Sequence, residues 1–469
     1  MPLPNIVFHR PSGSPARERR PQEPPGWNDR SLFRLIWPLI IEQLLAVTMG
    51  AADTVMVSSV GEFAVSGVNI VDNINNFFII AFTALAAGGA VVTSQYIGRQ
   101  DRANSSSASK QLIYIVTILS LGIMVFVLPL RRPIIRLLYG NISPLVMREA
   151  DIYLLITAMS YPFLAIYNGC AALYRAAGNS KVPMGIALLV NIINVGGNAF
   201  FIFVLHIGVG GAALSTLLSR IIAAAVLIIL LVTNRRSPIS LAGLRRVQLN
   251  RKMINNIFNV GIPGAMENSM FQVGRLLSQR IFTFFGTAAM AGNAIASVVN
   301  SFSFMPGMAF GMALITVVGQ CIGAGDYEGA KKQTAKIMKA GYITLFLISL
   351  LNYIFMEPLI SLFHLSAEAH NLAKDYLRIH CITMGLFWGV SFMLPNALRA
   401  AGDARFVMWV ATISMWVVRV NFAYLLTFFF KLGSIGVWIA MGMDFVSRGT
   451  FYTIRWFRGK WKEKRVIKE

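Results

Sequence analysis

Long apolar stretches alternate with short polar segments along most of the chain, from about residue 33 to residue 456. Each stretch approaches or exceeds the roughly 20 residues that an α-helix needs to cross the hydrocarbon core of a bilayer. The pattern therefore predicts an all-α integral membrane protein with twelve transmembrane helices. These helices are expected at approximately 33–58, 67–92, 110–131, 151–173, 183–205, 208–233, 256–282, 291–318, 337–359, 370–397, 405–429 and 434–456.

The longest polar segment between the apolar stretches, 234–255, lies at mid-chain. It predicts a cytoplasmic linker between an N-terminal lobe, 31–233, and a C-terminal lobe, 256–457, with six helices in each lobe. Residues 1–30 are rich in proline and arginine and contain no apolar run followed by a small-residue cleavage site. They predict a disordered cytoplasmic tail rather than a signal peptide. Residues 458–469 are expected to form a basic cytoplasmic tail.

The two lobes repeat one sequence pattern at a nearly constant spacing, which is 224 or 225 residues over most of the chain and 228 residues for Arg220 with Arg448 and Thr216 with Asp444. Pairs with this spacing are Pro38 with Pro263, Glu42 with Glu267, SQYIGRQD (94–101) with GQCIGAGD (319–326), and LYRAAGNSKVPM (173–184) with ALRAAGDARFVM (397–408). Because six helices bring the chain back to the same side, both lobes have the same orientation, with a pseudo-symmetry axis along the membrane normal. Transporters built this way bind substrate between or within the halves and alternate access by rocking one half against the other.

The composition excludes several classes of protein. The chain is 56% hydrophobic, 13% charged and has a mean hydropathy of +0.62, whereas soluble domains carry about 25% charged residues. Three cysteines exclude a disulfide framework, and five histidines without an i, i+4 pair do not predict a metal site. No GxxxxGK[ST] segment is present, so a P-loop ATPase in this chain is excluded, and transport must use an ion gradient or a separate subunit.

The net charge of +22 is distributed along the chain in a way that indicates topology rather than nucleic-acid binding. With the N-terminus inside, the inside segments carry about fourfold more lysine and arginine than the outside segments. This asymmetry predicts twelve spans with both termini in the cytoplasm, in the plasma (inner) membrane. The lipid bilayer is the expected partner of the basic segments, and no nucleic acid is expected.

Two acidic residues lie at bilayer depth in the first predicted helix, where an ionisable group is costly and marks a candidate site. Asp53 follows Glu42 by 11 residues, which is about three helical turns, so both face one side. Pro38 precedes Glu42 by one turn and predicts a hinge, as does Pro263 in the second lobe. The alternative for each acid is a structural role, as the partner of a backbone group or an arginine.

The second predicted helix begins with more polar groups than a lipid-facing surface tolerates. Asp72, Asn73 and Asn76 are expected to line a cavity, where they are candidates for binding substrate or a proton. The alternative is that they join helices through polar contacts.

The fifth and sixth predicted helices supply oxygen atoms near Asp53. Asn194 and Asn198 lie on one stripe of the fifth helix, and with Asp53 they offer one carboxylate and two amide oxygens. Thr216 of the sixth helix is a further oxygen donor. Such a set suits Na⁺, held chiefly by Asp53 and Asn194, and Asp53 alone also suits a proton.

The second lobe does not repeat this set, because Ser278 stands where the repeat places Asp53. Further substrate or proton candidates in this lobe are Glu267, Gln279 and Asp444. Arginines also lie in or near its predicted helices, where they are expected to snorkel to the interface or to pair with acids. They are Arg275, Arg280, Arg419 and Arg448.

Taken together, these motifs resemble the multidrug and toxic compound extrusion (MATE) family from about residue 31 to residue 457. The resemblance is carried by WPLIIEQLLAVTMGAADTVMVSSVG (37–61), SQYIGRQD, ALYRAAGNSKVPM, GIPGAMENSMFQVG (261–274), GQCIGAGD and ALRAAGDARF. It implies a V-shaped pair of six-helix lobes that exports cationic or amphipathic compounds in exchange for Na⁺ or H⁺.

The resemblance also implies roles for single residues. Asp53, Asn194 and Thr216 stand where the family places its cation site, whereas Asn198 stands where many members have a second aspartate. Glu267 lies near the acid used by another branch of the family.

The leading hypothesis is therefore a monomeric secondary antiporter for organic cations and other amphipathic compounds, with Na⁺ or H⁺ as the coupling ion and no cofactor. A flippase for lipid-linked sugars is the alternative within the same superfamily, but such proteins usually carry extra helices or a strongly basic cavity. An ion channel would need a pore ring or filter, and an intramembrane enzyme would need a nucleophile with a base or a metal set. The sequence shows neither.

Overall fold

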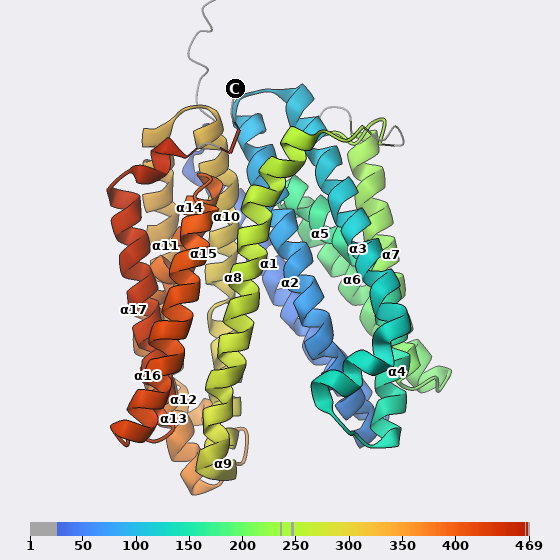
Figure 1. Cartoon of the computed structure of the whole chain (residues 1–469), viewed down its shortest axis with the longest axis vertical. Helices are drawn as coiled ribbons and strands as arrows, with labels where there is room; N and C mark the ends of the chain where they lie inside the picture. Colours follow the sequence, from blue (N-terminus) through green and yellow to red (C-terminus); the bar gives the residue numbers. More distant parts are fainter. Residues whose placement is uncertain (1–25, 235–236, 245–247, 465, 468–469) are drawn as a thin grey trace, which may run out of the picture.

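The computed structural model describes residues 26–234, 237–244, 248–464 and 466–467. The expected tail up to residue 25, and parts of the linker and of the basic C-terminal tail, lie outside these ranges. Within them the chain is almost entirely helical (Figure 1). The all-α prediction is confirmed.

Helices of the first half form the lobe drawn from blue to light green in Figure 1. They are α1 (Asp29–Ser58), α2 (Glu62–Gly98), α3 (Arg102–Tyr139), α4 (Pro144–Met159), α5 (Tyr161–Ala176), α6 (Lys181–Asn198) with the π-helical η1 (Ala199–Val204), and α7 (Val209–Thr233). The side chain of Asn28 caps α1 by accepting a hydrogen bond from the backbone N–H of Ser31 at 2.9 Å.

The second half forms the other lobe. Its first elements are α8 (Arg251–Arg280), η2 (Ile281–Phe285), α9 (Gly286–Ser303), α10 (Met305–Gly323), α11 (Tyr327–Ile354), α12 (Met356–Ser361) and α13 (Ala367–Thr383). It continues with η3 (Met384–Met393), α14 (Leu394–Ala400), α15 (Ala404–Ile413), η4 (Ser414–Val420), α16 (Asn421–Tyr424), η5 (Leu425–Phe429), α17 (Ile435–Phe457) and η6 (Lys460–Glu463).

These elements make the twelve crossings that the sequence predicts. Nine segments of the described chain are long and apolar enough to span a bilayer, and α4 with α5, bent by 47° at Ser160, makes a tenth. One of the nine, Arg251–Gly323, contains two crossings, since α8 is followed by α9 and α10. Helix α17 is the twelfth, and it carries the buried Asp444 and Arg448.

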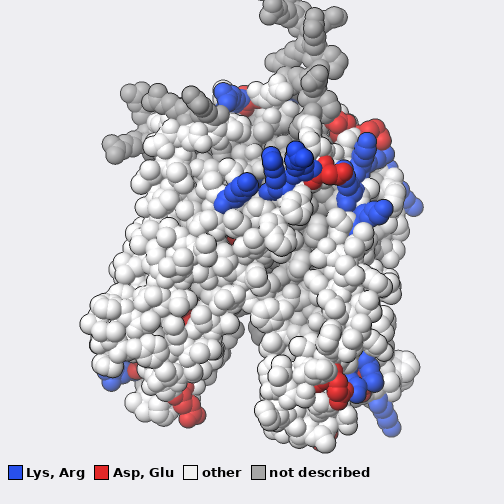
Figure 2. Space-filling view, turned by 180° about the vertical axis from the view of Figure 1, so that it is seen from behind, with Lys and Arg blue, Asp and Glu red and all other residues white. Residues whose placement is uncertain are grey.

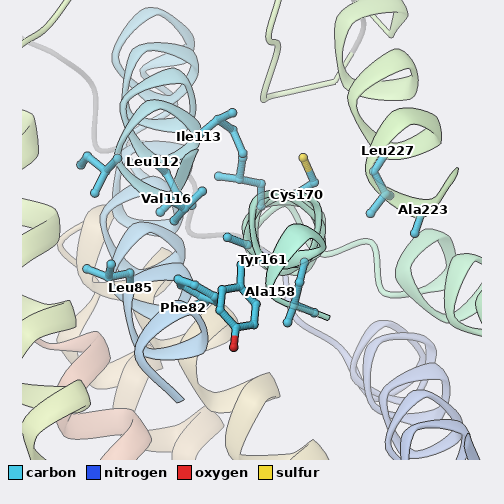
Figure 3. Close-up of a cluster of buried hydrophobic side chains, with 14 of the residues drawn as sticks. Phe82, Leu85, Leu112, Ile113, Val116, Ala158, Tyr161, Cys170, Ala223 and Leu227 are labelled. Atoms are coloured by element: carbon cyan, nitrogen blue, oxygen red, sulfur yellow. The ribbon is translucent and has the colours of Figure 1, made fainter. Parts of the chain in front are cut away.

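Each lobe has its own hydrophobic core. One comprises residues of α2 to α8, and Figure 3 shows Phe82, Leu112, Tyr161 and Cys170 packed within it. The other lies among η2 to η6, but it also includes Leu32, Leu35, Ile36 and Leu39 of α1. Helix α1 therefore begins in the core of the C-terminal lobe and ends in the N-terminal lobe, where Val57 is buried. Its Pro38, like Pro263 of α8, lies inside a continuous helix.

The lobes meet at the end of the molecule where the C-terminus lies and separate toward the other end (Figure 1). The space-filling view shows a cleft between them at the separated end (Figure 2). On this face a broad band free of lysine and arginine crosses the middle of the molecule, and basic side chains gather near the joined end. The band fits a helix surface in contact with hydrocarbon.

Candidate functional site

Asp53 lies on the C-terminal half of α1 and contacts the end of α6. The Nδ2 of Asn198 donates a hydrogen bond of 2.5 Å to Oδ1 of Asp53. Asn198 is fully buried, whereas Asp53 is half-buried. The helix passes into the π-helical η1 directly after Asn198. Such π-helical turns often occur at functional sites because they change the direction of side chains locally.

Asn194 and Thr216 complete this group from α6 and α7. Asn194 Nδ2 donates to Oγ1 of Thr216 at 3.2 Å, and Ser215 Oγ donates to the backbone carbonyl of Asn194 at 2.7 Å. The structure therefore brings together Asp53, Asn194, Asn198 and Thr216, the four residues that the sequence singles out as a cation site.

Two oxygen atoms of this group lack partners. The side-chain Oδ1 atoms of Asn194 and Asn198 are buried and accept no hydrogen bond from the described residues. Leaving a buried amide oxygen unsatisfied costs free energy comparable to a lost hydrogen bond. A cation bound beside Asp53 would supply both oxygens with a partner, so the donor set fits Na⁺.

The polar segment 72–76 of α2 is only partly exposed. Asp72, Asn73 and Asn76 are exposed, whereas Asn75 is buried, where it accepts a hydrogen bond of 2.7 Å from the hydroxyl of Tyr161. Of the predicted candidates, Asp72 is the one connected to Asp53, because both carboxylates interact electrostatically with Arg220.

Arg220 of α7 was not predicted to belong to this site. Its Nη1 donates to Oγ of Ser160 at 2.6 Å, at the bend between α4 and α5. The guanidinium lies close enough to attract Asp53 and Asp72 without forming a direct ion pair in the described structure. The sequence signal that could have drawn attention to it is its recurrence in the second lobe as Arg448, 228 residues later.

Glu42 and Glu267 occupy equivalent positions in the two lobes, and each pairs with an arginine. Glu42 Oε1 accepts from Arg175 Nη1 at 2.6 Å, and both carboxylate oxygens of Glu267 accept from Arg399 Nη2 at 2.7 Å. Glu42 does not join the Asp53 group, although both acids face one side of α1. A role of either acid in binding substrate or a proton stays a prediction.

Removing one partner of the Glu267–Arg399 pair is expected to destabilise the C-terminal lobe. In Glu267→Gln the guanidinium of Arg399 loses its carboxylate in a largely buried place, and we expect a loss of about 3 kcal/mol. The double variant Glu267→Gln/Arg399→Gln should regain much of it. Thermal unfolding of purified protein measures both effects, with exposed Glu368 changed to glutamine as the control. Normal stability together with lost transport in Glu267→Gln would instead support a proton or substrate role.

The remaining candidates of the second lobe lie apart from Asp53. Asp444 is fully buried in α17, where its Oδ1 accepts hydrogen bonds from Arg448 and Ser414. Gln279 is exposed near the end of α8.

The joined end of the molecule is closed by a pair of symmetric hydrogen bonds, which we call the latch. Gln95 of α2 donates from Nε2 to the carbonyl of Ala400 at 2.7 Å, and Gln320 of α10 donates to the carbonyl of Ala176 at 2.8 Å. Each bond joins one lobe to the other, at equivalent positions of the repeat. Thr316 adds a third link, to the carbonyl of Arg175 at 2.9 Å.

Two like-oriented lobes that are latched at one end and open at the other, with ionisable groups inside the helices, are typical of membrane transporters built from repeats. The MatE family model matches the chain twice, over residues 38–200 and 263–425, so this chain belongs to the MatE (MATE) family. The two matches lie one in each lobe, at the spacing of the repeat. The family prediction is confirmed, and the protein is a multi-pass membrane transporter and not an enzyme.

Relatives cover nearly the whole chain. It is 28% identical to the uncharacterized transporter YisQ of Bacillus subtilis, over 92% of this chain and 95% of that protein. It is 27% identical to the probable multidrug resistance protein NorM of Thermotoga maritima, over 93% and 94%. An outward-facing multidrug resistance MATE family transporter of the MOP superfamily has the same fold, with a TM-score of 0.86 and 19% identity over 93% of this chain and 96% of that one.

Proposed function

We propose that this protein is a secondary antiporter that exports organic cations and other amphipathic compounds in exchange for Na⁺ or H⁺. The observation that carries the proposal is the half-buried carboxylate of Asp53 beside two buried amide oxygens without partners. Its similarity to relatives such as the probable multidrug resistance protein NorM of Thermotoga maritima supports export of drugs.

The coupling ion is cargo that binds at Asp53. A cation there neutralises the carboxylate, and rotation of the Asn198 amide presents its Oδ1 in place of the Nδ2 that now donates to Asp53. A proton neutralises the same carboxylate without using the amide oxygens. Occupancy of Asp53 thus changes the charge and the hydrogen bonding between α1 and α6 in either case.

Helix α1 is the element that transmits this change to the other lobe. Asp53 lies near its end in the N-terminal lobe, whereas Leu32, Leu35 and Leu39 are packed in the C-terminal core. Pro38 lies within the part packed in the C-terminal core, between Leu35 and Leu39, and it supplies no N–H to the helical hydrogen bonds, which favours bending there. A shift at Asp53 therefore acts on the angle between the lobes.

The distribution of basic residues supports an orientation for the cycle. Lysine and arginine gather near the joined end, which we place in the cytoplasm together with both termini, in the plasma (inner) membrane (Figure 2). The cleft then opens to the outside, so the latch is the cytoplasmic seal. The protein works as a monomer in the lipid bilayer, without a cofactor and without nucleic acid.

Reconstitution into liposomes tests the function. Efflux of ethidium is followed by fluorescence while a Na⁺ gradient or a pH gradient is imposed, one at a time. We expect saturable efflux that is driven by one gradient and abolished when that gradient is collapsed. Efflux that depends on neither gradient, or an ohmic current instead of saturable efflux, would overturn the proposal.

A further inference from the structure

Three arginines and one aspartate converge in the C-terminal lobe, where α8, η4 and α17 meet. We call this group the arginine cluster; its members are Arg275, Arg419, Arg448 and Asp444. Asp444 is 0% exposed, Arg448 is 2% exposed and Arg419 is 7% exposed. Arg275 of α8 is exposed, and its positive charge acts on that of Arg419. It is therefore the member of the cluster that lies at the surface, near the buried members.

The single carboxylate satisfies only one of these arginines. Arg448 Nε donates to Oδ1 of Asp444 at 2.8 Å, and Ser414 donates to the same oxygen at 2.7 Å. Arg419 Nη1 lies 3.9 Å from Oδ2 of Asp444, which is too far for a hydrogen bond. The cluster therefore carries an excess of positive charge, and buried guanidinium groups without a counter-charge are costly at this depth.

Unpartnered polar atoms mark a place for a ligand in this cluster. Arg448 Nη2, Arg419 Nε and Asp444 Oδ2 are buried and make no hydrogen bond to the described residues. Two of these atoms are guanidinium donors, and they belong to side chains that are more than nine-tenths buried. An oxyanion beside them would supply an acceptor and the missing negative charge.

Aromatic rings cover the flat faces of the same guanidinium groups. The Phe271 ring lies 5.4 Å from Cζ of Arg419 and 5.3 Å from Cζ of Arg448, and the Phe392 ring lies 5.6 Å from Cζ of Arg448. Phe392 in turn stacks on Trp388, with ring centroids 5.0 Å apart. Because the rings cover the faces of the guanidinium groups, the N–H groups at their edges are the atoms that can form hydrogen bonds to a ligand. The same rings offer an aromatic surface against which the apolar part of a ligand can pack.

The repeat places this cluster opposite the Asp53 group, with the opposite charge. Arg448 is the counterpart of Arg220, and Asp444 is the counterpart of Thr216. Arg419 lies within one residue of the counterpart of Asn194. One lobe thus presents a carboxylate with amide oxygens, and the other presents arginines, at equivalent depths of the two bundles.

We propose that the arginine cluster is a binding site for the carboxylate, sulfonate or phosphate group of an amphipathic organic anion whose apolar body packs against Phe271 and Phe392. This rests on the proposed export function and extends its substrates from cations to amphipathic acids. The same chemistry would also recognise the headgroup of an anionic phospholipid, and the experiment separates the two sources.

Binding is measured by fluorescence with three probes that share one apolar body: 1-pyrenebutyrate, its neutral amide, and a pyrenebutyl trimethylammonium salt. The protein is held in nanodiscs of phosphatidylcholine. We expect 1-pyrenebutyrate to bind more tightly than the other two, and Arg419→Gln or Arg275→Gln to weaken it about tenfold or more. Arg448→Gln/Asp444→Asn removes the buried ion pair as a unit, so it reports on Arg448 without leaving an unpaired acid. Arg280→Gln, an exposed arginine on the same helix, is the matched control and should bind like the unchanged protein.

Equal affinity for the three probes, or unchanged binding of 1-pyrenebutyrate in both Arg419→Gln and Arg275→Gln, would overturn the proposal. Nanodiscs that contain phosphatidylglycerol separate the sources. If this lipid competes with 1-pyrenebutyrate, the oxyanion site also accepts a phospholipid headgroup. If it does not compete, the ligand of the site is a free organic acid. The assay needs no ion gradient, so Asp53→Asn should retain 1-pyrenebutyrate binding. Loss of gradient-driven efflux therefore tests the antiport function alone.

Discussion

Replacing Asp53 by asparagine is expected to abolish ion-driven efflux, lowering its rate at least tenfold, while the protein remains folded. The carboxylate is a formal negative charge that Asn198 contacts directly, and a neutral amide in its place would bind neither a proton nor Na⁺ with comparable strength. Since Asp53 is only half-buried and forms no ion pair within 4.0 Å among the described residues, the change leaves none of their arginines without a direct partner. Ethidium efflux from liposomes with the effective gradient imposed measures the effect.

Two further variants separate coupling from a general loss of charge. Asp375→Asn removes a half-buried acid that pairs with exposed Arg378, and efflux should be unchanged. Asn198→Asp places a second carboxylate beside Asp53, so it should retain transport and strengthen the response to Na⁺. Full efflux in Asp53→Asn, with the gradient still required, would remove Asp53 from the coupling site.

The apolar pattern and the repeat were enough to predict the twelve crossings and their division into two lobes. The length of an apolar stretch can be read from the sequence alone. It predicts a helix that crosses the membrane, because backbone N–H and C=O groups cannot remain unpaired in hydrocarbon and a helix pairs them within one segment. The pattern does not show that α1 begins in the opposite core, since Leu32 and Leu39 would look the same in either lobe. Which lobe buries them depends on tertiary packing.

The residues around Asp53 were predictable in part. The stripe of Asn194 and Asn198 follows from helical spacing, and the resemblance to the family pointed to Thr216. An arginine partner was the alternative role for Glu42, but the particular arginines that pair with Glu42 and Glu267 were not predicted, because they lie 133 and 132 positions away in sequence. The repeat contained a usable signal, since both acids and both arginines recur at nearly one spacing. Residues that recur together in both halves are candidates for contact.

The arginine cluster shows the limit of the same reasoning. The sequence places Arg419 and Arg448 in predicted helices and suggests that such arginines pair with acids. Counting acids does not reveal that these arginines form their ion pairs with Asp444, whereas Glu267 pairs with Arg399 and attracts Arg448 from farther away. Whether charges at bilayer depth are balanced depends on which side chains lie next to one another, and only the folded structure shows these contacts.

Introducing a side chain at Gly98 or Gly323 is expected to break the latch and abolish transport. A Cβ at Gly98 would collide with the backbone carbonyl of Gln320, and a Cβ at Gly323 would collide with that of Gln95. Because both obstacles are backbone atoms, α2 and α10 must move apart to admit any side chain. Gly98→Leu should therefore lower gradient-driven efflux at least tenfold, since the lobes no longer close at this end.

A cysteine placed at the contact between α2 and α10 reports directly on this closure. Ser94 of α2 is 0% exposed and faces Gly319 of α10, so the thiol of Ser94→Cys should resist a water-soluble maleimide. With Cys170, Cys321 and Cys381 changed to alanine, Gly98→Leu should make this thiol react at least tenfold faster. Gly122→Leu is the matched control, because a Cβ at Gly122 meets nothing within 4 Å. If the thiol stays protected while efflux is lost, the latch is not the seal, and the glycines act instead through the packing of α2 on α10.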